Sequence, residues 1–222
     1  MSTRLFHILI AITAILGAIV LSVSFSINPA PPAGATIAQV EAWGKAHETL
    51  ILAGAWLQAI GSLLEVIFIL GIIVIAGATQ RLAGWITAFA ATVIMTVSMV
   101  EVSFYISAVQ SGVSGNLNGL SISLTLIQAI QHAYVIVPAP AMLIGLGIVI
   151  LESRVLPRIF GYLGLAFGVV LGVLGFVGTF TSLQQVIDYV LTAQEVWFVA
   201  AGIALIVITG KVRSSAVASE VS

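Results

Sequence analysis

The sequence predicts an all-α fold, a bundle of six transmembrane helices, and two observations support this prediction. Of the 222 residues, 60% are hydrophobic and 7% are charged, and the mean hydropathy is +1.23. Apolar residues make up only about half of a soluble domain. The chain also contains six apolar stretches long enough to cross a hydrocarbon core of roughly 30 Å, which takes about 20 helical residues. We therefore expect a single transmembrane domain over residues 1–222.

Each span has recognisable limits in the sequence. A proline-rich loop follows the first span, and a short amphipathic interfacial helix is expected at residues 36–49, with Thr36 as its N-cap. The fourth span is long for one crossing and contains Pro138 and Pro140, which predict a kink because proline removes a backbone donor. The expected spans are residues 4–27, 50–78, 84–109, 120–151, 159–180 and 187–210.

The basic residues predict the orientation. With six spans, both termini lie on the side that carries six of the seven basic residues, and Lys45 is alone on the other side. Lysine and arginine concentrate on the cytoplasmic side of membrane proteins. We therefore expect a multi-pass protein of the bacterial inner membrane with cytoplasmic termini. A cleaved signal peptide is the alternative for the first span, but its apolar run is longer than a typical signal-peptide core.

Four ionisable residues lie within the predicted spans: Glu65, Glu101, His132 and Glu195. Such a residue at the bilayer centre costs roughly 2.5–3.5 kcal/mol on insertion scales and is usually functional. Polar neighbours recur on the same helix faces at spacings of three to four residues. These neighbours include Gln58, Tyr105 and Gln128, with Gln131 and Gln194 beside the stripes.

The stripes suggest one shared polar pocket that opens toward the outer side. In this interpretation Glu65, Glu101 and Glu195 bind or transport a proton, a cation or a small polar solute. His132 would tune their protonation, and Gln58, Gln128 and Tyr105 would act as hydrogen-bonding partners. The alternative is a structural role, in which each acid is protonated and only holds neighbouring helices together.

The same residues leave a metal site or a haem open, in a membrane enzyme or redox subunit. Glu65, Glu101, His132 and Glu195 are candidate metal ligands, although the Glu-x-x-His pair of di-iron bundles is missing. The absence of cysteine and of nucleophile motifs favours a non-enzymatic role. The net charge of −1 gives no reason to expect a nucleic acid partner.

Glycines recur every three to four residues on the fifth predicted span. Small residues at this spacing allow helix backbones to approach closely. We expect them to pack within the fold, although a homodimer or a partner membrane subunit is the alternative. The glycines are Gly161, Gly164, Gly168, Gly172, Gly175 and Gly178.

The turn Glu152-Ser153-Arg154-Val155-Leu156-Pro157-Arg158, followed by this glycine-rich span, resembles one found in a group of bacterial proteins. These are uncharacterised six-helix integral membrane proteins of the domain-of-unknown-function type. The resemblance covers about residues 141–178. It implies a bacterial inner-membrane protein and carries over no catalytic residue.

Overall fold

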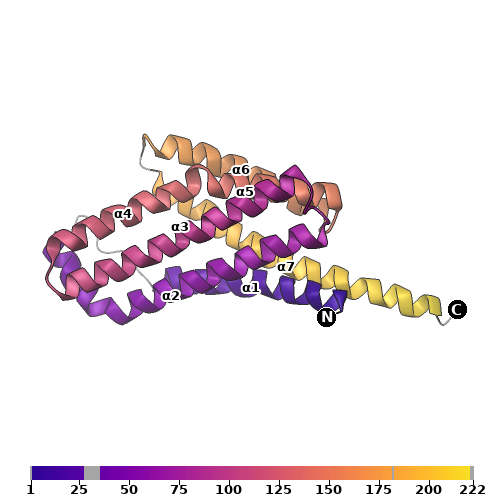
Figure 1. The fold of residues 1–222 in the computed structure, drawn as a ribbon, viewed down its shortest axis with the longest axis horizontal. Coiled ribbons are helices and arrows are strands. Elements are labelled where there is room, and N and C mark those ends of the chain that lie inside the picture. Colours follow the sequence, from indigo (N-terminus) through magenta and orange to yellow (C-terminus); the bar gives the residue numbers. More distant parts are fainter. Residues whose placement is uncertain (1, 28–35, 182, 221–222) are drawn as a thin grey trace.

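The computed structural model describes residues 2–27, 36–181 and 183–220, and the described chain is helical without strands (Figure 1). Six helical stretches are long and apolar enough to span a membrane, as expected, because α4 and α5 together make one of them. The helices are α1 (Thr3–Ile27), α2 (Ile37–Ile75), α3 (Leu82–Val113), α4 (Leu117–Ile136), α5 (Pro138–Ser153), α6 (Arg158–Gly178) and α7 (Gln184–Glu220).

Helix α2 begins where the sequence predicts a cap. The Thr36 hydroxyl accepts from the Gln39 backbone, and the Gln39 side chain accepts from the Thr36 backbone, which forms a capping box. The structure does not separate residues 36–49 from the following span, however. Because no proline interrupts this stretch and its alanine, glutamine, glutamate and lysine favour a helix, the chain continues as one 39-residue helix. The expected loop before Thr36 lies largely outside the described residues.

The predicted kink in the fourth span is confirmed. Helix α4 ends at Ile136, Val137 has φ −134° and ψ −55°, and α5 restarts with Pro138 in its first turn. Proline is well placed there because the first backbone N–H groups of a helix have no intrahelical acceptor.

The helices pack so that α1 lies between α2 and α7, while α3 contacts α2, α4 and α5. The glycines of α6 pack against other helices of the same chain, as expected. A Cβ on Gly168 would lie 3.0 Å from the Pro140 oxygen, and one on Gly175 would lie 2.4 Å from the Val135 oxygen. Helix α6 therefore fits closely against α4 and α5.

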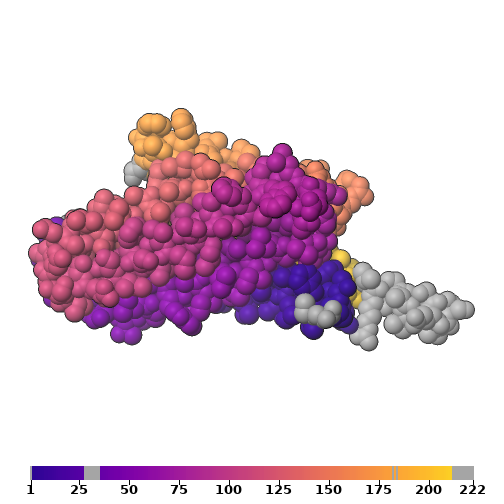
Figure 2. Space-filling view, in the orientation of Figure 1, coloured from indigo at the N-terminus to yellow at the C-terminus, as the bar shows by residue number. Residues whose placement is uncertain are grey.

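The helices differ in length in a way that sets the depth of the site. Helix α6 has 21 residues, about 31 Å at 1.5 Å per residue, which matches a hydrocarbon core of about 30 Å. Helices α2 and α3, with 39 and 32 residues, are about 58 and 48 Å long. At the end opposite the two termini, α2, α3 and α4 extend past α6 (Figures 1 and 2).

This extension has a small apolar cluster of its own. The cluster comprises Ala108, Leu120 and Ile127, with Val40, Phe104, Tyr105 and Leu124 packed against it. The main apolar core is larger and lies mostly toward the end that holds the termini. The fully buried large side chains of this main core include Phe68, Ile72, Met142, Leu146, Phe198 and Leu205.

Candidate functional site

Glu101 lies at the centre of a hydrogen-bonded cluster between α2, α3 and α4. Its Oε2 accepts from Gln58 Nε2 at 2.6 Å, and its Oε1 accepts from Gln131 Nε2 at 2.7 Å. Gln131 Nε2 also lies 3.4 Å from the Tyr105 hydroxyl oxygen. Both oxygens of this buried carboxyl group therefore have an amide donor, and the donors come from two neighbouring helices.

Ser62 and Ser98 extend this polar contact one turn along α2 and α3, with 2.8 Å between their hydroxyl oxygens. Both serines are buried. The polar stripes predicted on these two helices therefore face each other across the α2–α3 contact.

Glu65 and Glu195 form a different kind of contact, in which one carboxyl group faces another. The two side chains, on α2 and α7, are within hydrogen-bonding reach of each other. Ionised carboxylates are acceptors only, and two carboxyl groups in contact cannot both stay ionised. This pair must therefore hold a proton or a cation between its oxygens.

Three buried side-chain oxygens on α2 and α7 accept no hydrogen bond within the described residues. They are Glu65 Oε1, Glu195 Oε2 and Gln194 Oε1. The amide nitrogen of Gln194 donates to the Tyr134 hydroxyl at 3.3 Å. A buried polar atom normally has a partner, and a proton on one of the two carboxyl groups would let it donate to the other.

Tyr134, on α4, lies near both arrangements. Its hydroxyl accepts from Gln194 and is close enough to Glu65, Glu101 and Glu195 to be affected by their charge. This residue was not among the site residues predicted from the sequence. A usable signal was present, because Tyr134 follows Gln131 by three residues and so lies on the same face of α4.

Helix α1 packs directly against α2 at Glu65. A Cβ on Gly17 would lie 2.9 Å from Glu65 Cγ and 3.1 Å from Glu65 N, and one on Gly61 would lie 3.1 Å from the Gly17 oxygen. On its other side α1 meets α7, where a Cβ on Gly202 would lie 2.7 Å from the Ala11 oxygen. The small residues let α1 hold the helices that carry Glu65 and Glu195 together.

The acidic residues lie at two depths. Glu65 is about ten residues from the end of α2 at Ile75, which corresponds to about 15 Å, or half of a 30 Å hydrocarbon core. Glu101 is about 19 residues from the neighbouring end of α3 at Leu82, which corresponds to about 28 Å. Measured from the end of the bundle that holds the chain termini, the amide-bound carboxyl group therefore lies farther along than the carboxyl pair.

Positive charge is kept away from this site. Arg81 pairs with Glu152 at 3.3 Å on the exposed surface, and Lys45 pairs with Glu41 one turn away on α2. In the described structure, the hydrogen-bond partners of the three glutamates are amides or another carboxyl group. Toward the end of the bundle that holds the chain termini, the surrounding core is apolar.

The structure does not bring His132 or Gln128 to the acids. His132 Nε2 lies 3.2 Å from the Thr179 hydroxyl oxygen beyond the end of α6, and its Cε1 would lie 3.4 Å from a Cβ on Gly178. Gln128 is exposed on α4. Gln58 and Tyr105, in contrast, both lie in the cluster around Glu101.

The described residues contain no group of three histidine, aspartate or glutamate side chains arranged to hold a metal ion. His132, one of the four candidate ligands, faces α6, and the carboxyl pair supplies only two acidic ligands. Gln194 Oε1 is a further buried oxygen without a hydrogen-bond partner among the described residues.

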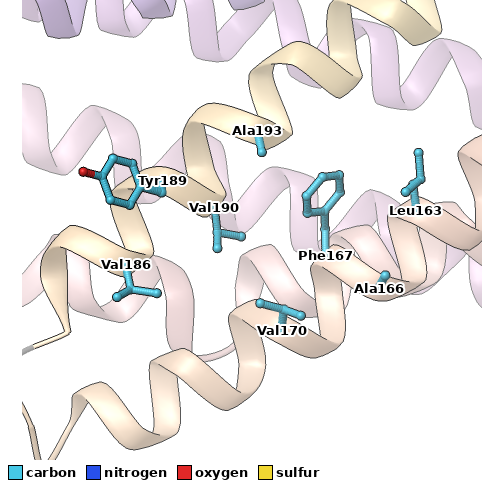
Figure 3. Close-up of a pocket in the computed structure, with 8 residues that line it drawn as sticks. All are labelled: Leu163, Ala166, Phe167, Val170, Val186, Tyr189, Val190 and Ala193. Carbon is cyan, nitrogen blue, oxygen red and sulfur yellow. The ribbon is translucent and has the colours of Figure 1, made fainter.

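Two surface grooves in the described structure are apolar and contain none of the glutamates. One, of about 300 Å³, runs between α6 and α7, where Phe167 and Tyr189 face it (Figure 3). The other, of about 480 Å³, lies between α3 and α5 beside Pro138. The glutamates lie in the packed interior and not in these grooves.

No protein-family model matches the chain, and no curated protein or solved structure gives a significant match.

Proposed function

We propose that this chain is a bacterial inner-membrane protein that binds a proton or a small cation at its buried glutamates and transports it. Glu65 and Glu195 form the central binding site, and Glu101 with Gln58, Gln131 and Tyr105 forms an outer polar layer. The observation that carries this proposal is the carboxyl–carboxyl contact, which needs a positive charge between its oxygens.

The proposed orientation has both termini in the cytoplasm. The ends of the chain lie at the same end of the bundle (Figure 1), and the turns that carry Arg81, Arg154 and Arg158 join the helix ends there. The positive-inside rule then assigns that end to the cytoplasm. The polar layer around Glu101 faces the outer side, and the apolar core closes the cytoplasmic side.

The location of the acids supports transport over a purely structural role. Ionisable residues inside a membrane mark ion pathways and proton relays. Glu101, Tyr134 and the carboxyl pair form a polar series from the outer edge of the hydrocarbon core to its middle. Glu101 has an amide donor for each of its oxygens, whereas Glu65 Oε1 and Glu195 Oε2 have no donor among the described residues.

Proton flux into proteoliposomes tests the proposal. Vesicles that enclose a pH-sensitive dye are given a membrane potential, and the change in internal pH is recorded. The wild-type protein should conduct protons faster than empty vesicles. The variant with Glu65→Gln, Glu101→Gln and Glu195→Gln should fall to the rate of empty vesicles.

Glu152→Gln is the matched control, because Glu152 is an exposed acid at the inner rim. It should conduct like the wild type. Equal flux through the wild type and the triple variant, with the potential imposed in either direction, would refute the proposed function.

A further inference from the structure

We propose that the groove between α3 and α5 binds one acyl chain of a phospholipid whose anionic headgroup lies against Arg81. The lipid belongs to the leaflet on the side of the chain termini. The inference does not depend on the buried glutamates and goes beyond the proposed function. Four features of the groove support it: its lining, its length, the position of a tryptophan at its end, and the charge at its rim.

The lining of the groove fits a hydrocarbon chain. Ala90 on α3 and Pro138 on α5 are buried and form its floor, while Trp85, Phe89 and Val137 are exposed and form its walls. The space between them is about 480 Å³, and no lining residue carries a charge. Such a groove offers contacts to an apolar chain and none to a charged solute.

The length of the groove matches one leaflet and not a whole membrane. On α3 it runs from Trp85 to Val93, about 12 Å at 1.5 Å per residue, and one leaflet contributes about 15 Å, half of the hydrocarbon core. On α5 it ends at Val137, where the helix is broken before Pro138. A partner transmembrane helix would need contacts through both leaflets, whereas an acyl chain needs them through one.

Trp85 places one end of the groove at the membrane surface. It lies in the first turn of α3, which begins at Leu82, and tryptophan is enriched where the membrane meets water. The Trp85 backbone nitrogen donates to the Arg81 oxygen at 3.1 Å, so Arg81 lies one helical turn farther out. The order of arginine, tryptophan and groove along α3 matches the order of headgroup, interface and acyl chain in a lipid.

The charge at this rim favours an anionic headgroup. Arg81 Nη1 donates to Glu152 Oε2 at 3.3 Å, yet the Arg81 side chain remains 49% exposed. A guanidinium has five N–H donors, and arginine binds phosphate oxygens through paired hydrogen bonds. Arg154, two residues after Glu152, is also exposed. The two arginines together outweigh the carboxylate.

Lipid titration followed by native mass spectrometry of the detergent-purified protein tests the headgroup. Phosphatidylglycerol and phosphatidylcholine with the same acyl chains are compared, and one bound lipid per chain is expected. Phosphatidylglycerol should bind about fivefold more tightly or better, the factor that one arginine near a membrane surface contributes. Arg81→Gln should weaken its binding about fivefold. Lys45→Gln, which removes another ion-paired cation on α2, should not change it.

Filling the groove tests the acyl chain. Ala141→Leu adds a larger side chain to the lining and should weaken the binding of both lipids. The matched control is Ala166→Leu, which fills the smaller groove between α6 and α7 (Figure 3) and should leave binding unchanged. A phosphatidylglycerol with a photoreactive diazirine at the end of one chain provides a readout on the wild type, with label expected at Val93 or Val137.

Equal affinity of the wild type for the two lipids would overturn the proposal. Unchanged lipid binding in Ala141→Leu, or photolabel confined to α6 and α7, would also overturn it. A dimer that retains no lipid would assign the groove to a second copy of the chain instead. Proton flux enters none of these measurements, so failure of this inference leaves the proposed function standing, and failure of proton flux leaves the lipid site standing.

Discussion

Glu101 and Glu65 are buried glutamates on adjacent helices, yet their surroundings give them different chemistry. Both oxygens of Glu101 accept amide N–H groups from Gln58 and Gln131. Glu65 faces another carboxyl group, that of Glu195, and one of its oxygens has no donor. The comparison shows that two buried acids on adjacent helices can differ in whether both of their oxygens have a hydrogen-bond donor.

Removing the carboxyl group of Glu101 should have the largest effect on stability. Glu101→Leu leaves the amides of Gln58 and Gln131 without their acceptor, and each unsatisfied buried group costs about 1–3 kcal/mol. We expect a loss of about 2–4 kcal/mol in the free energy of unfolding, measured by denaturation in detergent. Glu101→Gln should lose less because its amide oxygen still accepts from one neighbour, and an equal loss would contradict the assigned bonds.

Gly17→Ala should come next, because it pushes α1 away from the helix that carries Glu65. The added Cβ would lie 3.1 Å from the Glu65 backbone nitrogen, and backbone atoms give way poorly. Overpacking typically costs about 1–3 kcal/mol. The control is Gly44→Ala in the same helix as Glu65, where a Cβ meets nothing within 4 Å and helix propensity should make the change neutral or stabilising.

Replacing both members of the carboxyl pair should change stability little. Exchange of buried charged groups for packed apolar residues is often neutral or stabilising. Glu65→Leu combined with Glu195→Leu should therefore stay within about 1 kcal/mol of the wild type or exceed it, while its proton flux is lost. A loss of stability as large as that of Glu101→Leu would remove the distinction between the two acidic regions.

The smallest effect is expected at the serine pair between α2 and α3. Hydrogen bonds between membrane helices contribute about 0.6 kcal/mol on average, so Ser62→Ala should cost about that amount in unfolding measurements. Ser103→Ala is the control, since Ser103 is exposed and bonds only to the backbone of its own helix. A cost above about 2 kcal/mol for Ser62→Ala would exceed the range known for such bonds and indicate a wider network.

The six spans, the proline break and the Thr36 cap could be predicted because each depends on local sequence. Apolar length sets a span, Pro138 removes a backbone donor, and Thr36 precedes Gln39 at capping-box spacing. The single helix Ile37–Ile75 was not predicted. The amphipathic pattern of residues 36–49 suggested a separate helix. The helix continues instead, because no proline or other helix-breaking residue stops it before the following span.

The site was predicted in part, for a different reason. Helical spacing shows which residues share a face of one helix, and this identified Glu65, Glu101 and Glu195. It does not show which helices are neighbours or how they are rotated. Three features of the site depend on those tertiary relations. They are the contact of His132 with Thr179, the pairing of Glu65 with Glu195, and the position of Tyr134.

Carbodiimide labelling most directly tests the central claim that Glu65 and Glu195 share one charge while Glu101 is satisfied by amides. A hydrophobic carbodiimide reacts with carboxyl groups that carry a proton, and peptide mass spectrometry identifies the modified residue. Label on Glu65 or Glu195, with little on Glu101, is the result expected, and Glu195→Gln should change the labelling of Glu65. Equal label on all three glutamates, or label on Glu101 alone, would contradict the account.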